Sequence, residues 1–367
     1  MPPVNIMIKP VSSACNMRCG YCFYADVAAR REQADYGAMD QETMRELVRK
    51  VFLYADGSVA FSFQGGEPTL AGLPFYRAFI GAVRQYNSRS LPVTYALQTN
   101  GYAIDDGLLD FFAQQGFLLG VSLDGTRAAH DGCRKDRAGD GTYDRVRENI
   151  ARIRARGIAY NILCVVTAPL AAQGKACWDS LKEHQYLQFI PCIDDFSETP
   201  GAYSLSAEAY GRFLIETFGC YEKAYYSGHP VSERRFDNYI GILLGRQPEA
   251  CGMNGVCGQY FVAEADGGIY PCDFYVLDRW RMGNIHESSL RRMVGSEAAL
   301  EFRRSSLAFR DACAHCPWAF LCRGGCRRDR ESTDRKNRFC KSYTLFFDAC
   351  YDRMQRLAEA VAKRQAR

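Results

Sequence analysis

Residues 4–24 read VNIMIKPVSSACNMRCGYCFY, and this stretch decides how the rest of the chain is interpreted. Its first part, Val4–Ile8, is apolar enough to form a buried strand. The loop that follows contains Cys15, Cys19 and Cys22 within eight residues. Loops after the C-terminal ends of buried parallel strands are where α/β proteins place their functional groups. The stretch therefore predicts an α/β fold with a site in its first loop.

The same unit recurs along the first half of the chain. Apolar stripes at helical spacing separate the strand candidates, with Met44, Leu47 and Val48 in one stripe and Val146 and Ile150 in another. Alternating strands and helices of this size indicate parallel βα units, and six of them predict a partial (β/α)6 TIM-like barrel. The five further strand candidates are VAFSF from Val59, VTYAL from Val93, FLLGVSL from Phe117, YNILCVV from Tyr160 and YLQFI from Tyr186.

Polar motifs follow several of these strands. QGGEP occupies residues 64–68, QTNG begins at Gln98, and SLDG begins at Ser122. Because parallel strands present their carboxyl ends at one rim, these motifs are expected to share that rim with the cysteine loop. Gly, Asn and Asp also favour ordinary turns. That interpretation stays open for Gln98, Asn100 and Asp124.

The pattern changes beyond about residue 195. A helical stretch is expected near residues 206–225, and a cysteine-rich region spans residues 251–340. Residues 259–272, QYFVAEADGGIYPC, indicate a hairpin with Asp266-Gly267 at its turn. This region has little apolar core of its own, so bound metal is expected to stabilise it. A C-terminal helix is predicted over residues 346–367, and the domain division is predicted as 1–235 and 236–367.

Composition limits the partners and the cellular location that the protein is expected to have. Among 367 residues, 46 Lys and Arg face 42 acidic residues, and a net charge of +4 favours neither a nucleic-acid nor a membrane partner. No apolar run reaches the ~20 residues of a membrane span, and the N-terminus does not resemble a secretory signal. A cytoplasmic protein is expected. In a reducing cytosol its 17 cysteines indicate metal ligation or catalysis rather than disulfides.

The Cx3Cx2C spacing of Cys15, Cys19 and Cys22 resembles that of the radical S-adenosylmethionine (radical SAM) enzymes. Three thiolates are too few for a closed zinc site, but they can hold a [4Fe–4S] cluster with one iron open. The resemblance implies that SAM chelates this iron. It also implies that the backbone of the GGEP motif, Gly65–Pro68, meets the SAM amino group. The SAM contacts implied in this way are Tyr24, Gly66, Ser122, Arg134 and, beside adenine, Ile193.

A second set of cysteines resembles the SPASM domain, a module that carries two auxiliary [4Fe–4S] clusters. The resemblance assigns Cys251, Cys257, Cys272 and Cys326 to the first cluster. It assigns Cys313, Cys316, Cys322 and Cys340 to the second. Paired CxxC motifs also form zinc ribbons, which is the alternative here. The apolar residues around Cys164 predict a core position for it. No function is assigned to the six remaining cysteines, which are Cys133, Cys164, Cys177, Cys192, Cys220 and Cys350.

Longer strings resemble one family in particular, the anaerobic sulfatase-maturating enzymes. The matching strings are IKPVSSACNMRCGYCFY, FQGGEPTLAGL, LQTNG, NILCVVT, CGMNG and YPCDFYVLD. The resemblance implies oxidation of a Cys or Ser residue of a sulfatase to Cα-formylglycine. It also implies SAM and three [4Fe–4S] clusters as cofactors, a Cys/Ser-x-Pro-x-Arg segment as substrate, and a reductant such as ferredoxin or flavodoxin. One departure is that the stretch between Thr167 and Gln188 is shorter than the resemblance leads us to expect.

The implied chemistry needs a general base, and Asp273, directly after Cys272, is the candidate. A structural carboxylate beside the cluster is the other interpretation of Asp273. An alternative function is modification of a ribosomal peptide by thioether or crosslink formation. Such enzymes often carry an N-terminal leader-binding domain, for which a first strand at residue 4 is expected to leave no room. A non-catalytic electron carrier is disfavoured by the SAM motifs, and the basic run from Arg323 to Arg338 is expected to offset cluster charge or to face solvent.

Overall fold

The computed structural model describes residues 3–196, 201–258, 260–308, 311–330 and 336–365. The chain forms two compact units that interleave along the sequence. Unit 1 comprises residues 1–122, 134–160 and 258–304, and unit 2 comprises residues 123–133, 161–257 and 305–367. The two expected domains, 1–235 and 236–367, stay a prediction, because compactness alone does not define a functional boundary.

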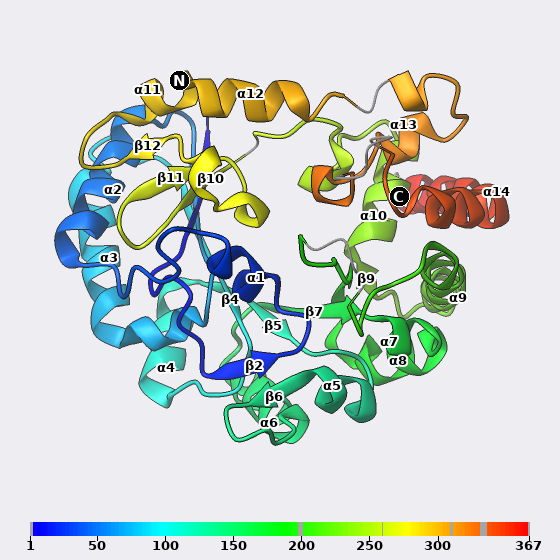
Figure 1. The fold of residues 1–367 in the computed structure, drawn as a ribbon. Helices are drawn as coiled ribbons and strands as arrows, with labels where there is room; N and C mark the ends of the chain where they lie inside the picture. The colour runs from blue at the N-terminus through cyan, green and yellow to red at the C-terminus, as the bar shows by residue number, and fades with distance from the viewer. Residues whose placement is uncertain (1–2, 197–200, 259, 309–310, 331–335, 366–367) are drawn as a thin grey trace. The chain divides into compact units, whose positions relative to one another are not determined.

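Unit 1 is built on a mostly parallel sheet with the strand order β12-β11-β10-β1-β3-β4-β5 (Figure 1). Parallel pairing joins β1 to β3, β3 to β4 and β4 to β5, with Ile6 opposite Phe61 and Phe61 opposite Tyr95. The strands are β1 (Val4–Ile8), β3 (Val59–Phe63), β4 (Val93–Thr99), β5 (Leu118–Ser122), β10 (Phe261–Ala263), β11 (Gly268–Tyr270) and β12 (Gly283–Asn284). The short strands β2 (Met17–Cys19) and β6 (Arg134–Asp136) form a separate antiparallel pair.

The helices of unit 1 bury one stripe each. In α2 the predicted stripe, including Met44, Leu47 and Val48, is fully buried, and Asp40 caps the helix by accepting from the Thr43 backbone N–H. Helices α2, α3 and α4 follow one another along the outer side of the strands (Figure 1). The helices are α1 (Phe23–Ala29), α2 (Gln41–Tyr54), α3 (Gly72–Tyr86), α4 (Asp106–Gln115), α6 (Tyr143–Ala155), α11 (Leu290–Val294) and α12 (Glu297–Ser305).

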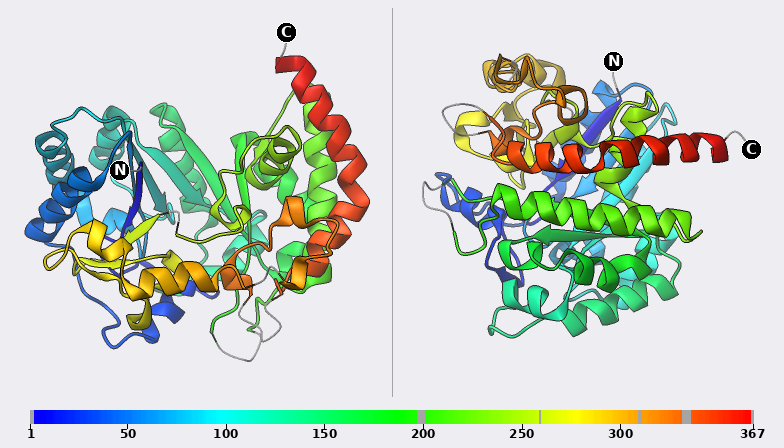
Figure 2. Two further views of the ribbon diagram at one scale, coloured as in Figure 1. Left: turned by 90° about the horizontal axis from the view of Figure 1, so that it is seen from above. Right: turned by 90° about the vertical axis from the view of Figure 1, so that its right-hand side faces the viewer.

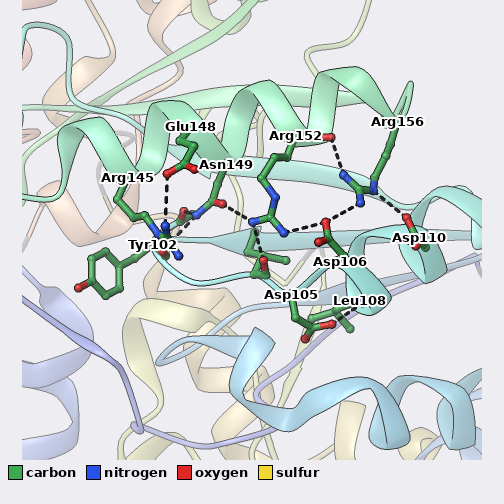
Figure 3. A network of polar contacts seen from close by, with 12 residues as sticks. Tyr102, Asp105, Asp106, Leu108, Asp110, Arg145, Glu148, Asn149, Arg152 and Arg156 are labelled. Atoms are coloured by element: carbon green, nitrogen blue, oxygen red, sulfur yellow. Dashed lines mark hydrogen bonds and ion pairs between the residues drawn. The ribbon is translucent and has the colours of Figure 1, made fainter.

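The loop after β4 is held by side chains of α6 (Figure 3). Asn149 Nδ2 donates to the carbonyl of Gly101 at 2.7 Å, and Arg152 donates to the carbonyl of Ile104 at 2.9 Å. Arg152 and Arg156 also pair with Asp106 at the start of α4. These ion pairs are partly exposed and contribute little stability individually. The hydrogen bonds to the carbonyls of Gly101 and Ile104 fix the backbone that follows Asn100.

The hairpin predicted in the cysteine-rich region is present, and it extends the sheet of unit 1. Strands β10 and β11 pair antiparallel with Val262 opposite Tyr270, and Asp266-Gly267 lies in the turn. The sequence pattern did not indicate that β10 also pairs in parallel with β1, with Ile6 opposite Phe261. Residues 258–304 therefore share a core with the first strands, burying Tyr270, Trp280 and Phe302 among others. The expectation of a poor apolar core was wrong for this part, and Gln259, at the start of the predicted hairpin, lies outside the described residues.

Unit 2 contains three strands in parallel, in the order β7-β8-β9. They are β7 (Tyr160–Val166), β8 (Tyr186–Pro191) and β9 (Ser232–Glu233). All six strands expected from the sequence are thus confirmed, as is the α/β fold class. The longer helices of unit 2 are α5 (Arg127–Cys133), α8 (Gly174–Leu181), α9 (Ala207–Tyr226), α10 (Arg234–Leu243) and α14 (Cys340–Gln365), with α7 (Ala168–Ala171) and α13 (Ala319–Cys322) as single turns.

The two longest helices of unit 2 pack against each other, as Figure 2 shows for α9 and α14. At Gly211 of α9, a Cβ would lie 3.2 Å from the Cα of Ser342 in α14, so the missing side chain allows the close approach. Ser342 Oγ donates to the carbonyl of Ala207 at 2.6 Å. The expected C-terminal helix begins at Cys340, six residues earlier than predicted, and its last two predicted residues lie outside the described part. Among the described residues, no helix is long and apolar enough to span a bilayer.

Candidate functional site

The cysteine loop is shaped by two local interactions. Strand β2 pairs with β6 so that Cys19 lies opposite Arg134, and the Cys22 backbone N–H donates to the carbonyl of Cys19 at 3.2 Å. Cys22 then forms the N-cap of α1. All three thiols, those of Cys15, Cys19 and Cys22, are half-buried and free of disulfides. The loop therefore presents its three thiols together from one short, backbone-fixed segment.

Nitrogen donors lie against two of these thiols. Asn100 Nδ2 is 3.7 Å from Cys15 Sγ, and the Met17 backbone N–H is 3.4 Å from the same sulfur. Arg134 Nη1 is 3.8 Å from Cys19 Sγ. Burial raises the pKa of the Cys15 thiol, whereas the contacts from Met17 and Asn100 lower it. Such donors stabilise the charge of ligated thiolates and tune the potential of an iron–sulfur cluster.

The three thiols suit a [4Fe–4S] cluster, in which each thiolate binds a different iron. Three half-buried thiols with partial positive charge beside two of them fit this arrangement.

The GGEP loop lies against the cysteine loop through its backbone. Gly66 N donates to the carbonyl of Ser12 at 3.0 Å, and Glu67 N donates to the carbonyl of Ala14 at 2.7 Å. A Cβ on Gly66 would stand only 1.9 Å from the Ala14 carbonyl oxygen. Glycine is therefore required at this position by the close approach of two backbones.

The Glu67 carboxylate joins two loops, a role that sequence reasoning missed. Its carboxylate is 1% exposed and accepts from Asn100 N at 2.7 Å, from Thr99 Oγ1 at 2.8 Å and from Thr69. Burial raises the pKa of Glu67, and these hydrogen bonds oppose the rise by favouring the carboxylate. The glutamate thus fixes the QTNG loop to the GGEP loop.

Asp273 lies in the same unit, at the start of the turn that follows β11. It is 5% exposed, and its Oδ2 accepts from Tyr24 Oη at 2.6 Å. Its other oxygen, Oδ1, has no hydrogen-bond partner among the described residues. Tyr24 Oη is also 3.1 Å from Gln64 Oε1. The phenol has a single proton, and the shorter contact, to Asp273, takes it. The Gln64 amide is therefore best assigned in the flipped orientation, in which its nitrogen donates to Tyr24 Oη.

A buried set of charges lies behind this pair. Lys9 Nζ is 5.1 Å from the ring centroid of Tyr24 and 3.4 Å from Glu264 Oε2, which also pairs with Arg31 at 2.5 Å. Lys9 and Arg31 therefore both face the buried carboxylate of Glu264, and the charge of Lys9 also acts on Asp273. Burial raises the pKa of Asp273, and the charge of Lys9 opposes the rise. Sequence reasoning missed Lys9, which looks like the polar end of an apolar strand.

The remaining predicted contacts divide between the units. Ser122 is half-buried at the end of β5 in unit 1, and Arg134 is 6% exposed with its guanidinium 5.4 Å from the Tyr21 ring centroid. Ile193 is half-buried after β8 in unit 2. Asp124 binds the backbone of β7, because its Oδ1 accepts a hydrogen bond from Val165 N at 2.9 Å. The side-chain amide of Gln98 packs against Gly120, where a Cβ would otherwise stand. The buried Oε1 of Gln98 has no hydrogen-bond partner within the described part.

The four cysteines assigned to the second auxiliary cluster all lie in unit 2 and influence one another. Burial raises the pKa of Cys322 to about 12, with smaller contributions from Cys340, Cys313 and Cys316 and against the backbone hydrogen bond from Gly324, which lowers it. Burial also raises the pKa of Cys313, with smaller contributions from Cys316 and Cys340. Of the other set, Cys251 and Cys257 interact, and a Cβ on Gly252 would be 3.5 Å from Cys326 Cβ. Cys272 is in unit 1, with Tyr260 Oη 3.6 Å from its sulfur, so its place in that set stays a prediction.

Two other features lie outside this site. Cys164 is 1% exposed in β7, and its sulfur lies 3.8 Å from the sulfur of the buried Cys177, which confirms its expected core position.

A groove of about 670 Å³ between α3 and α4 is lined by Arg77, Arg84 and Asp110 among others, and it includes no residue of the site.

Comparison with known proteins identifies the class to which the chain belongs. Residues 10–170 match the radical SAM superfamily, and residues 251–317 match an iron–sulfur cluster-binding domain. The chain is 39% identical over 373 residues to the cysteine-type anaerobic sulfatase-maturating enzyme of Clostridium novyi, covering 100% of both. It is 30% identical to the serine-type enzyme of Klebsiella aerogenes, covering 94% of this chain and 84% of the relative.

Among solved structures, native anSMEcpe with bound AdoMet and Cp18Cys peptide matches with a TM-score of 0.92 and 38% identity. The match covers 98% of this chain and 100% of that one. Fold and site together define a radical SAM enzyme with an iron–sulfur cluster-binding domain. Within that class, the chain belongs to the anaerobic sulfatase-maturating enzymes.

Proposed function

We propose that this protein oxidises a Cys or Ser residue of a sulfatase polypeptide to Cα-formylglycine, with Asp273 as the general base. The observation that carries the proposal is the carboxylate itself. Asp273 is buried, one of its oxygens is held by Tyr24, and the other has no partner among the described residues. A base must present a free lone pair to the proton that it removes, and Oδ1 is available for this purpose.

The residues that would hold the cofactors are those assigned by their motifs. Cys15, Cys19 and Cys22 would hold the first [4Fe–4S] cluster. The SAM contacts would be Gly66, Tyr24, Ser122, Arg134 and Ile193. When bound, the reduced cluster and SAM supply a 5′-deoxyadenosyl radical that removes a hydrogen atom from the substrate Cβ. The two sets of four cysteines would hold auxiliary clusters that accept the second electron, for a total of three clusters.

Asp273 Oδ1 would take the proton from the substrate thiol or hydroxyl. The nearby cation of Lys9 favours the ionised carboxylate that can do so, against the burial that disfavours it. Tyr24 fixes the orientation of the carboxylate by donating to Oδ2. For a Cys substrate, loss of two electrons and two protons gives a thioaldehyde, which water converts to the aldehyde with release of hydrogen sulfide. For Ser the same loss gives the aldehyde directly.

The substrate would be a segment of the Cys/Ser-x-Pro-x-Arg type, and the electron donor a ferredoxin or flavodoxin. A cysteine substrate is favoured, because the cysteine-type relative is 39% identical and the serine-type relative 30%. A cytoplasmic location agrees with the reducing conditions that free thiols require. Residues 1–235 would form the radical SAM part and residues 236–367 the cluster-binding part. The family matches over residues 10–170 and 251–317 support this division.

The test uses peptides with a Cys-x-Pro-x-Arg or a Ser-x-Pro-x-Arg core, incubated anaerobically with the cluster-loaded protein, SAM and a reductant. Mass spectrometry should find the exchange of hydrogen sulfide for oxygen in the Cys peptide, or the loss of two hydrogens in the Ser peptide. Release of 5′-deoxyadenosine without either product would contradict the proposed substrate. An absence of 5′-deoxyadenosine as well would contradict the proposed chemistry.

A further inference from the structure

In unit 2 the chain leaves the sheet at the segment Cys192–Asp194. This segment contains Ile193, the residue assigned to adenine. The Cys192 backbone N–H still donates to the carbonyl of Val166 at 3.0 Å, continuing the pairing of β7 and β8. The next residue, Ile193, lies beyond the last strand residue, Pro191. Its position is therefore set by contacts to the backbone on either side of it.

Two arginines from the basic run bind that backbone. Arg338 Nη2 donates to the carbonyl of Cys192 at 2.9 Å, and Arg328 Nη2 donates to the carbonyl of Asp194 at 2.6 Å. Arg338 also forms an ion pair with the Asp194 carboxylate, which accepts from Ser204 Oγ at 3.1 Å. The carbonyls that flank Ile193 are thus each held by a guanidinium group.

The arginines are themselves fixed in place. Arg328 is 7% exposed, with its guanidinium 3.8 Å from the Phe196 ring centroid. The Arg338 backbone N–H donates to the carbonyl of Asp329 at 2.8 Å. The expectation that this run faces solvent is therefore wrong for Arg328, whereas Arg338 is half-buried, with 26% of its side chain exposed. The alternative expectation, that the run offsets cluster charge, stays a prediction, and residues 331–335 lie outside the described part. A buried guanidinium is costly unless it is well hydrogen-bonded, and here the bonds go to the segment that contains Ile193.

Each arginine lies close in sequence to a predicted cluster ligand. Arg328 is two residues after Cys326, and Arg338 is two residues before Cys340. The Cys340 backbone N–H, which opens α14, donates to the carbonyl of Asn337 beside Arg338 at 2.8 Å. The cysteine-rich segment and the Ile193 segment are therefore joined by short, direct contacts within one unit.

We infer that Arg328 and Arg338 are positioning residues, which hold Ile193 in place for the adenine ring of SAM. The inference rests on the proposed function, which assigns Ile193 to adenine. Arg338 suits the role because its planar fork bonds a carbonyl and a carboxylate at once, which the single ammonium of lysine matches poorly. SAM affinity is thereby coupled to the order of the C-terminal cysteine-rich segment.

The experiment measures SAM binding by equilibrium dialysis with anaerobic, cluster-loaded protein, and iron is determined on the same samples. Arg338→Gln should raise the dissociation constant for SAM about tenfold, or ~1.4 kcal/mol, with iron per chain unchanged. Turnover at saturating SAM should stay near the wild-type value, so that KM for SAM rises while kcat holds. Arg338→Lys should recover part of the affinity. Arg323→Gln is the matched control, because this half-buried arginine contacts Phe320 and Gln247 instead.

A second variant protects the test against poor cluster loading. Asp194→Asn removes the carboxylate that Arg338 pairs with and lies far in sequence from the predicted cluster ligands, and it should also weaken SAM binding. Unchanged affinity in Arg338→Gln or Asp194→Asn at full iron content would overturn the inference, as would a loss strictly proportional to lost iron. Failure of the wild-type protein to bind SAM would overturn the proposed function and this inference together, whereas unchanged variants overturn the inference alone.

Discussion

Tyr24 Oη donates a hydrogen bond to Asp273 Oδ2 at 2.6 Å, across a separation of 249 residues in the sequence. The contact joins the helix that follows the three-cysteine loop to the turn that follows Cys272. It leaves Asp273 Oδ1 without a partner among the described residues. An oriented carboxylate with one free oxygen lies in the same unit as the first three cysteines, and this arrangement leads to the first prediction.

Asp273→Asn should retain the size of the side chain but remove its ability to accept a proton. Formylglycine formation should fall ~10²–10⁴-fold, the usual effect of losing a general base. SAM cleavage does not need this base, so 5′-deoxyadenosine should still appear and become uncoupled from product. Liquid chromatography and mass spectrometry of both products would measure this. Near-normal formylglycine output at full iron content would refute the assignment, and a parallel loss of iron, SAM cleavage and product would indicate a structural role.

Iron content tests the number of clusters. Three [4Fe–4S] clusters correspond to about twelve iron atoms per chain. The combined replacement of Cys15, Cys19 and Cys22 with Ala should leave about eight and abolish SAM cleavage. Elemental analysis of the reconstituted protein would count iron and zinc together. Zinc in place of iron in the triple variant would contradict the assignment of two auxiliary clusters.

Gly66→Ala tests the close approach of the GGEP loop to the cysteine loop. The added Cβ would meet the Ala14 carbonyl oxygen at 1.9 Å, so one backbone must move. Overpacking of this kind costs ~1–3 kcal/mol, and SAM binding should weaken with it. Gly81→Ala, in α3, is the control because its Cβ meets nothing within 4 Å. That change should be neutral or raise the melting temperature. Equal behaviour of the two variants would show that the loop tolerates a side chain.

Glu233 should make stability depend on pH. This buried residue caps α10, and burial raises its pKa from 4.5 to about 7. The folded state therefore favours the neutral acid, whose contribution is complete below pH 4.5 and is lost as pH rises through about 7. The loss amounts to ~3 kcal/mol in the wild-type protein.

Glu233→Gln cannot ionise and should show a flatter melting-temperature profile between about pH 5.5 and 8. If the glutamine amide caps α10 less well than the carboxyl group, the melting temperature is lowered by an amount that does not vary with pH. Glu208→Gln is the control, because Lys341 lowers the pKa of this carboxylate to below the window. Identical slopes in the wild type and Glu233→Gln would contradict the predicted titration.

Much of the fold follows from local patterns. The six strands were predicted because each is an apolar run of five to seven residues between turn signals, as in Val59–Phe63. Pairing between β1 and β10 was missed, because β10 has three residues and parallel register between distant segments leaves no local pattern. The cysteine loops were evident from spacing alone. By contrast, the proximity of Lys9 and Glu264 to Tyr24 and Asp273, and the contacts of Arg328 and Arg338, depend on tertiary structure.

The parallel pairing of β1 with β10 has a consequence for biosynthesis. Strand β1 emerges from the ribosome long before its second neighbour, Phe261–Ala263, is translated. Until then β1, with Ile6 and Ile8 along it, remains an open edge of the kind that promotes association between chains. The strand that leads into the cysteine loop is therefore completed late in translation. Nascent chains stalled before residue 263 should require holding by chaperones.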